Sequence, residues 1–210
     1  MKLYTYDPAP NPRRLTLFMA YKGISLPTEQ IDMMSGAQMA DHYRAINPDC
    51  TVPALVLDDG TVMTEVIGIC TYLEAMYPDK PLLGSTPLEK ALVSGWDHKL
   101  FNMVVSAVAE VLRNSSPGFV DRALPGPVNV PQIPALAERG KQRLEHAWQT
   151  LEAEITGKTF LAGEHLSLAD IDLLVCAEFA GWVKSAPPVS CSALHTYLDR
   201  VRTELGLNVD

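Results

Sequence analysis

Residues 47–65 read NPDCTVPALVLDDGTVMTE, and this stretch decides the fold of the first part of the chain. Pro53 can open an alternating strand, but it cannot sit centrally in one because it lacks the N–H that a ladder needs. Val52 is therefore expected to mark an edge of the sheet. The Asp59-Gly60 pair between two apolar runs is a strong hairpin signal, since glycine accepts a positive φ. The stretch predicts a tight hairpin of two antiparallel strands.

The residues after the hairpin predict a helix. The segment from Glu65 to Tyr77 is ended by Pro78, and it places apolar residues on one helical face: Ile67, Cys70, Leu73 and Tyr77. Glu65 lies in the first turn of this helix.

The residues before the hairpin predict a βαβ unit. Leu3–Tyr6 reads as a strand, Pro12–Lys22 as a helix closed by Gly23, and Glu29–Met33 as a second strand. A further helical stretch is expected near Gln38–Ile46. Together with the hairpin and its helix, the predicted order is βαβ followed by ββα.

Strand patterns cease after Tyr77, where prolines at 78 and 81 predict a stiff linker over residues 78–87. Apolar stripes of helical period run from Leu88 to Leu112 and from Leu136 to Ile155. The run Ser167-Leu168-Ala169-Asp170 has the spacing of a capping box and predicts a helix that extends to Trp182. Residues 88–207 are therefore expected to form an all-helical domain.

The segment between the two stripes is rich in proline, at positions 117, 125, 127, 131 and 134. It cannot be helical throughout. Two interpretations stay open: it overhangs a substrate pocket, as long loops in compact domains often do, or it is a surface connection without functional consequence.

Composition narrows the functional classes. The chain has 210 residues, 47% of them hydrophobic and 20% charged, which is enough to bury a substantial core in one or two domains. Its formal net charge of -8 argues against nucleic acid or an anionic membrane as partner. No apolar run has the length of a membrane span and no signal-peptide core is present, so we expect a cytoplasmic protein. The 4 cysteines form no Cys-x-x-Cys pair and the 5 histidines no ligand spacing, so no metal is expected.

The Asn-Pro, Val-Pro and Asp-Gly pairs, followed by Glu65, resemble the thioredoxin-like domain of bacterial-type glutathione S-transferases. The resemblance implies a glutathione-binding domain over residues 1–77, a helical domain over residues 88–207 that shapes the second-substrate pocket, and a homodimer. It also implies a cis bond before Pro53, with the backbone of Val52 pairing with the cysteinyl part of glutathione. The chain departs from the family pattern at Val66, where a serine hydroxyl would meet the γ-glutamyl carboxylate.

The resemblance places the thiol-activating loop at residues 9–15. Serine-type and cysteine-type members carry their activating group at the position of Ala9, and a methyl group cannot replace it. The side-chain N–H of Asn11 can donate to sulfur, as in nu-class members with a similar Thr-Pro-Asn run; alternatively, Asn11 is a helix N-cap before Pro12. Tyr6 is the second candidate for activation. Two interpretations of Arg13 and Arg14 stay open: they raise the electrostatic potential around the sulfur, or they are simply exposed cations.

The same resemblance suggests further contacts. Glu65 would accept from the γ-glutamyl ammonium, although a carboxylate at a helix N-terminus is also stabilising by itself. Gln38 would reach the glycyl carboxylate. An apolar pocket for the electrophile would be lined by residues that are alternatively core: Trp96, Phe101, Met103 and Trp182.

The predicted activity is attack of an enzyme-stabilised glutathione thiolate on a small apolar electrophile. Two alternatives remain open. One is glutathione-dependent disulfide reduction without an enzyme cysteine. The other is a non-catalytic protein of the same fold that binds glutathione or another ligand, which Ala9 and Val66 jointly favour.

Overall fold

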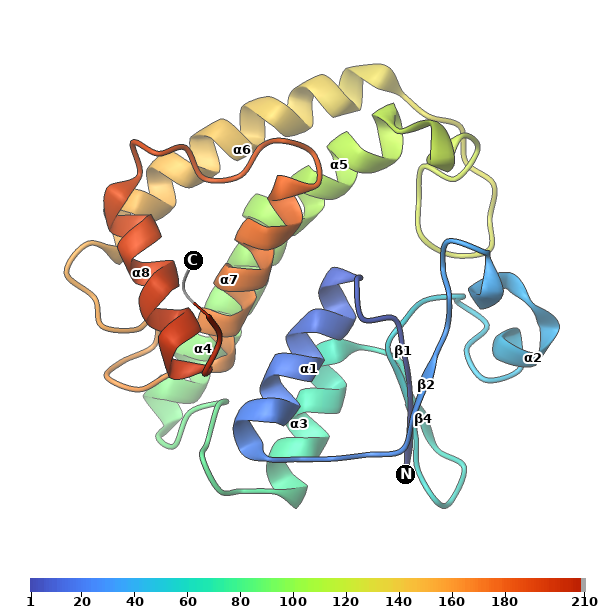
Figure 1. Cartoon of the computed structure of the whole chain (residues 1–210), viewed down its shortest axis with the longest axis horizontal. Helices are drawn as coiled ribbons and strands as arrows, with labels where there is room; N and C mark the ends of the chain where they lie inside the picture. The colour runs from blue at the N-terminus through green and yellow to red at the C-terminus, as the bar shows by residue number, and fades with distance from the viewer. Residues whose placement is uncertain (209–210) are drawn as a thin grey trace. The chain divides into compact units, whose positions relative to one another are not determined.

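The computed structural model describes residues 1–208, which form two compact units. The first unit contains Met1–Lys80 together with Leu124–Asn129, and the second contains Pro81–Ala123 and the described residues from Val130 onward. Figure 1 labels their helices and strands. Within residues 1–208, no helix is long and apolar enough to cross a membrane.

A mixed four-stranded sheet forms the centre of the first unit, in the order β2-β1-β3-β4. Its strands are β1 (Lys2–Thr5), β2 (Thr28–Gln30), β3 (Ala54–Val56) and β4 (Val62–Met63). Strand β1 pairs parallel with β2 and antiparallel with β3, which pairs antiparallel with β4. A parallel pair needs a crossover and an antiparallel pair needs a turn, so the sheet confirms the predicted βαβ-ββα order.

Three helices accompany this sheet: α1 (Pro10–Lys22), α2 (Asp41–Arg44) and α3 (Val66–Met76). Helices α1 and α3 pack against each other on one side of the sheet, whereas α2 lies on the other side (Figure 1). The single helical stretch expected near Gln38–Ile46 is instead a 3-10 turn, Ala37–Met39, followed by α2. The extended backbone of Ala40, with ψ 147°, separates the two pieces.

The hairpin has the predicted chemistry. Gly60 has a φ of 87°, and the Thr61 N–H donates to Asp59 Oδ1 at 2.9 Å. Pro53 precedes the first residue of β3, so its missing N–H removes no bond from the ladder. Because β3 is nevertheless an inner strand, Val52 lies in the segment that leads into it and does not mark an edge of the sheet.

The buried face of α3 differs from the predicted one. Ile67 and Tyr77 are 37% and 39% exposed, whereas Cys70 and Leu73 are buried as expected. The helix begins at Val66, and Val66 and Ile69 complete the core face. Ile67 stands about 100° around the helix from Val66, which turns it toward solvent.

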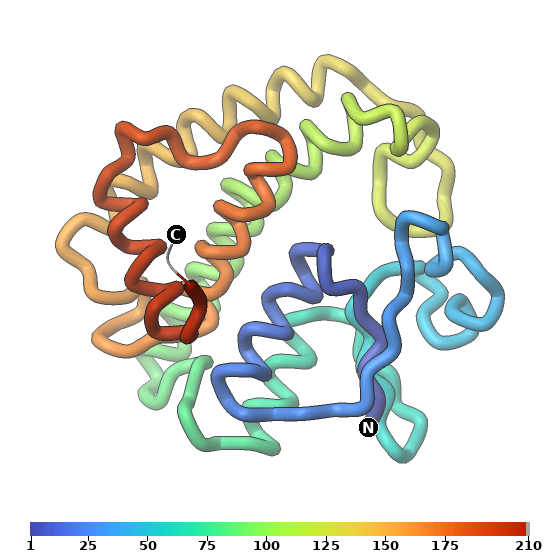
Figure 2. Tube along the Cα trace, viewed as in Figure 1, coloured from blue at the N-terminus to red at the C-terminus, as the bar shows by residue number. Residues whose placement is uncertain are grey.

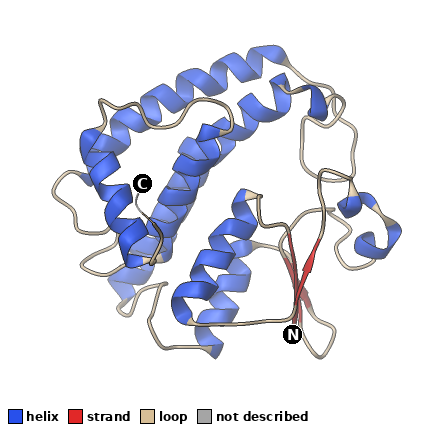
Figure 3. Cartoon of the chain, in the orientation of Figure 1, coloured by secondary structure: helices blue, strands red, loops and turns tan. Residues whose placement is uncertain are grey.

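The second unit is all-helical, as the secondary-structure colouring of Figure 3 shows. Its α-helices are α4 (Pro87–Leu100), α5 (Ser106–Ser115), α6 (Pro134–Ile155), α7 (Leu168–Gly181) and α8 (Ser192–Glu204). Helix α7 is buried along nearly its whole length and forms the core of this unit. The predicted capping box is present, with the Ser167 N–H donating to Asp170 Oδ2 at 2.7 Å.

The stripe predicted from Leu88 to Leu112 is not one continuous α-helix. A π-helix, Phe101–Val105, separates α4 from α5. Leu88 and Leu92 are 68% and 40% exposed, so the first part of the predicted face is wrong. The wider π turn changes the phase of the helix, and a single 3.6-residue period therefore cannot describe both sides of it.

The proline-rich segment is irregular, as predicted. It contains one 3-10 turn, Pro117–Phe119, and an isolated bridge between Arg122 and Val130. Its tip, Leu124–Asn129, belongs to the first unit. A Cβ placed on Gly126 would lie 3.6 Å from the carbonyl oxygen of Asp49, so the tip approaches the loop before β3.

Candidate functional site

Segments that are separate in the sequence meet around one apolar cluster of the first unit. The cluster consists of Ile31, Tyr43 and Val52, and the partly buried residues that pack against it include Tyr6 and Ala9. The structure therefore brings the loop after β1 to the segment that leads into β3. The Cα trace in Figure 2 follows both segments.

The peptide bond between Val52 and Pro53 is cis, as the resemblance implied. Two buried side chains hold the preceding residue, Thr51. The Asn47 side-chain amide donates to the Thr51 carbonyl at 2.8 Å, and the Tyr43 hydroxyl donates to the same oxygen at 2.5 Å. Burial raises the pKa of Tyr43 to about 12, so its hydroxyl remains a donor at neutral pH.

These bonds fix the carbonyl group that directly precedes Val52. Within residues 1–208, the backbone N–H and C=O of Val52 form no backbone hydrogen bond, although the residue lies only two positions before a paired strand. Free main-chain groups of this kind can pair with the backbone of an extended peptide ligand. Sequence reasoning identified Val52 but missed Tyr43 and Asn47; the Asn47-Pro48 pair, which favours turn initiation, was the available signal.

Helix α1 begins at Pro10, two residues earlier than predicted. Its N-cap is Ala9, whose side chain makes no capping bond, and Asn11 occupies the second helical position. The interpretation of Asn11 as an N-cap is therefore wrong. Pro10, with its preset φ and absent donor, takes the first helical position that was expected for Pro12.

The first turn of α1 has an unusual set of donors. Pro10 and Pro12 have no N–H, and the N–H of Asn11 has no acceptor within the helix because its partner would lie before the helix start. No acidic residue occupies this turn. The Asn11 side chain is exposed, and its Oδ1 accepts from Arg14 Nη1 at 3.3 Å. Asn11 thus offers a backbone donor and a side-chain donor at the positive end of the helix dipole.

Ala9 and Tyr6 are part of the same turn, since the Ala9 N–H donates to the Tyr6 carbonyl at 2.9 Å. Both side chains are partly buried against the apolar cluster. The methyl group of Ala9 supplies no hydrogen bond at the position where the resemblance implied a hydroxyl or thiol. The role of Tyr6 in activation stays a prediction.

Glu65 is the N-cap of α3, and its exposed side chain makes no capping hydrogen bond. The carboxylate is therefore available to an ammonium group. Val66, the first helical residue, is 4% exposed, so its methyl groups belong to the core. Its backbone N–H has no acceptor within the helix, and together with the helix dipole it favours a carboxylate ligand even without a serine hydroxyl.

Gln38 lies in the 3-10 turn and is 1% exposed. Its Oε1 has no hydrogen-bond partner within residues 1–208. A buried polar atom without a partner typically costs about 1–3 kcal/mol. Only a ligand N–H or O–H that donates to this oxygen would remove the cost. A glycyl carboxylate would instead accept from the side-chain N–H of Gln38, and that expected contact stays a prediction.

The four residues expected around an electrophile all lie in the second unit but differ in environment. Trp96 is 8% exposed, and the ammonium groups of Lys99 and Lys158 lie 4.7 and 5.1 Å from its ring centroid, so it is a core residue. Phe101 and Trp182 are 51% and 52% exposed. Their apolar rings, with the partly buried Met103, remain accessible.

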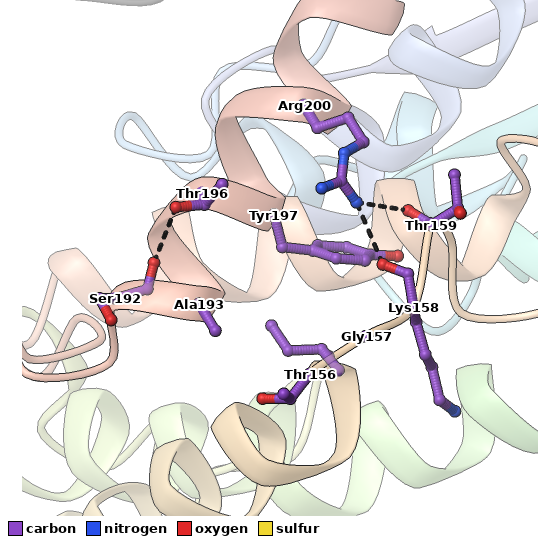
Figure 4. A pocket seen from close by; sticks show the side chains of 10 residues that line it. Thr156, Gly157, Lys158, Thr159, Ser192, Ala193, Thr196, Tyr197 and Arg200 are labelled. Atoms are coloured by element: carbon purple, nitrogen blue, oxygen red, sulfur yellow. Dashed lines mark hydrogen bonds between the residues drawn. The ribbon is translucent and has the colours of Figure 1, made fainter.

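The second unit also has a cavity of about 620 Å³ between the end of α6 and α8 (Figure 4). Arg200 reaches across it and donates to the carbonyls of Lys158 and Thr159 at 3.1 and 2.9 Å, while the Thr196 hydroxyl donates to Ser192. The Arg200 bonds join α8 to the loop after α6, whereas the Thr196 bond lies within α8. None of the predicted site residues lines this cavity.

Both parts of the chain match models of one family. Residues 9–76 match "Glutathione S-transferase, N-terminal domain", and residues 116–204 match "Glutathione S-transferase, C-terminal domain". The chain belongs to the glutathione S-transferase family. A curated relative within this family, glutathione S-transferase 2 of Saccharomyces cerevisiae, is 27% identical over 205 residues, which cover 96% of this chain and 85% of the relative.

Solved glutathione S-transferase structures share the fold over nearly the whole chain. A glutathione S-transferase domain-containing protein of Marinobacter aquaeolei is 29% identical, with a TM-score of 0.86 over 96% of this chain and 97% of that chain. Gtt2 of Saccharomyces cerevisiae is 26% identical, with a TM-score of 0.87 over 98% and 99% of the two chains. The predicted thioredoxin-like domain followed by a helical domain is thereby confirmed.

Proposed function

We propose that the protein is a glutathione transferase that conjugates the glutathione thiolate to an apolar electrophile. One observation carries the proposal: Ala9, the N-cap of α1, packs in the same cluster as Val52. The unpaired backbone of Val52 and the donors of Asn11 therefore belong to neighbouring segments. Family membership supports the general activity.

The first unit offers one group for each polar part of glutathione. The Val52 backbone pairs with the cysteinyl residue, and Glu65 accepts from the γ-glutamyl ammonium. The N–H of Val66 donates to the γ-glutamyl carboxylate, and Gln38 bonds the glycyl carboxylate. Because the net charge of the chain is -8, attraction of this anionic ligand relies on these local donors.

The energetic demand of thiol activation matches the donors at α1. A free thiol titrates near about 8.5, and lowering this pKa by about two units requires about 2.7 kcal/mol of thiolate stabilisation. A hydrogen bond to a charged group contributes about 1.5–3 kcal/mol and a helix N-terminus about 0.3–1 kcal/mol. Together the side chain of Asn11 and the α1 dipole supply about 1.8–4 kcal/mol, a range that includes the required value without a hydroxyl at position 9.

The sulfur attacks the electrophilic carbon, a C–S bond forms, and the leaving group departs with its electron pair. Phe101, Met103 and Trp182 are proposed to contact the apolar part of the electrophile. Because the thiolate is the only charged reactant, the protein's main task is to hold the sulfur deprotonated and positioned.

Three variants test the proposal through the ultraviolet absorbance of bound thiolate as a function of pH at saturating glutathione. Asn11→Ala removes the side-chain donor and is expected to raise the bound-thiol pKa by about one unit or more, since one unit is about 1.36 kcal/mol. Asn11→Asp keeps the acceptor for Arg14 but removes the donor, so it should raise the pKa as well. Ala9→Ser restores a hydroxyl and should lower it.

An unchanged bound-thiol pKa in both Asn11 variants would remove Asn11 from the activating role and leave Tyr6 or backbone donors. Rates with an aryl halide and with a disulfide distinguish conjugation from disulfide reduction. Glutathione binding without turnover of either substrate would identify a non-catalytic binding protein and refute the proposed activity.

A further inference from the structure

Arg14 is an unusual residue of the first turns of α1, because it is charged and only 8% exposed. Of the two interpretations of Arg14, a cation that raises the local potential or a simply exposed one, its burial excludes the second. Its Nη1 instead donates to Oδ1 of Asn11 at 3.3 Å, one helical turn earlier. Asn11 itself is exposed. A buried guanidinium therefore holds the side chain of the exposed residue beside it.

This contact determines which way the Asn11 amide faces. A guanidinium has donors but no acceptor, so its partner must be the amide oxygen and cannot be the amide nitrogen. With Oδ1 turned toward Arg14, Nδ2 on the other branch of the carboxamide faces away from Arg14. The reversed amide would bring two sets of donors together and break a hydrogen bond to a charged group.

The orientation is important for a thiolate ligand. A thiolate is stabilised by Nδ2–H and destabilised by the lone pairs of Oδ1, so only one of the two amide orientations lowers the thiol pKa. An exposed asparagine without a fixed partner can turn about its terminal bond, whose preference is weak. We propose that Arg14 is a positioning residue that holds the Asn11 amide with its N–H directed to the glutathione sulfur.

This inference rests on the proposed function, because it assigns Arg14 a role in the same thiolate site. Arg14 acts through Asn11 and does not touch the sulfur. A purely electrostatic effect of its positive charge makes a different prediction, since charge acts on the thiolate whether or not Asn11 is present. The two explanations are separated by combining substitutions at both positions.

The experiment is a double-mutant cycle read by the bound-thiol pKa at saturating glutathione, in the full-length chain. Arg14→Met keeps much of the side-chain volume and is expected to raise the pKa by about one unit, as Asn11→Ala does. In the Asn11→Ala background, Arg14→Met should cause no further rise. Arg13→Met is the matched control for loss of a cation from the same turn. Its effect on the bound-thiol pKa should be the same in the wild-type and Asn11→Ala backgrounds.

Equal rises for Arg14→Met in both backgrounds would overturn the inference in favour of a charge effect, and an unchanged pKa in folded Arg14→Met would overturn it outright. Because Arg14 is buried, equilibrium unfolding is measured for every variant. If Arg14→Met fails to fold, Arg14→Lys provides the same test, because lysine keeps the charge but lacks the planar fork of the guanidinium. Arg14→Lys should raise the bound-thiol pKa by less than the rise expected for Arg14→Met, and only when Asn11 is present. Wild-type protein that leaves the pKa of glutathione at its free value would refute the proposed function itself, together with this inference.

Discussion

Replacing Glu65 by glutamine tests the proposed contact with the γ-glutamyl ammonium. The substitution keeps the size of the side chain and removes its charge. Because Glu65 forms no capping hydrogen bond, the unligated protein should lose only the interaction of its charge with the dipole of α3, about 0.3–1 kcal/mol. A hydrogen bond between charged groups contributes about 1.5–3 kcal/mol, so the dissociation constant for glutathione should rise about 10-fold to 150-fold. The exposure of Glu65 favours the lower end of this range.

The melting temperature converts this loss into a measurable shift. Glutathione at about 100 times the wild-type dissociation constant stabilises the folded protein by about 2.7 kcal/mol. At the same concentration, a 10-fold weaker variant gains about 1.4 kcal/mol and a 150-fold weaker variant about 0.3 kcal/mol. The ligand-induced shift should therefore fall to about one half or less. Titration calorimetry gives the dissociation constants directly.

Asp59→Asn is the matched control for Glu65→Gln. Asp59 is an exposed carboxylate of the same unit, and asparagine before Gly60 retains an acceptor for the turn. This variant should keep the full shift. A full shift in Glu65→Gln as well would exclude Glu65 from the binding site.

Three further predictions concern stability and assembly. A Cβ on Gly140 would lie 2.7 Å from a backbone oxygen of α5, so Gly140→Ala should destabilise the protein by about 1–3 kcal/mol. A Cβ on Gly95 would have nothing within 4 Å, so Gly95→Ala should stabilise the protein by about 0.5–1 kcal/mol. Equal effects of the two variants in denaturant titrations would contradict the close packing of α5 and α6. Burial opposes ionisation of Glu110, but hydrogen bonds from Arg139 and Arg143 outweigh it and hold the pKa of Glu110 below its usual value. The contribution of the Glu110 charge to stability is fully present above about pH 4.3 and is lost as the pH falls through the lower pKa of the folded state. Glu110→Gln should therefore lower the melting temperature most at pH 7 and by progressively less as the pH falls through the acid range. A loss that does not change with pH would refute the ion-pair origin. Light scattering should show the homodimer that the family resemblance implies, and a concentration-independent monomer at micromolar levels would contradict it.

Features set by local chemistry could be predicted from the sequence. The Asp59-Gly60 turn needs only a positive φ at Gly60 and an acceptor on Asp59, and both are properties of adjacent residues. The capping box of α7 is similarly local, because Ser167 and Asp170 are one turn apart. Such elements form the same contacts in any fold that contains them.

Features that depend on distant contacts or on competing local options could not be predicted. Two prolines, Pro10 and Pro12, both suit the start of α1, and spacing alone does not choose between them. The π-helix changes the phase of an apolar stripe without any proline or glycine within it to announce it. Burial of Arg14 likewise follows from packing around the helix, which a residue-type expectation of exposure cannot anticipate.

The thiol pKa of glutathione bound to the wild-type protein tests the central claim most directly. Thiolate absorbance is recorded against pH at saturating glutathione, with S-methylglutathione as a baseline because it has no thiol to titrate. Activation at the N-terminus of α1 predicts an apparent pKa about two units below the free value of about 8.5. A bound-thiol pKa at or above the free value would contradict it.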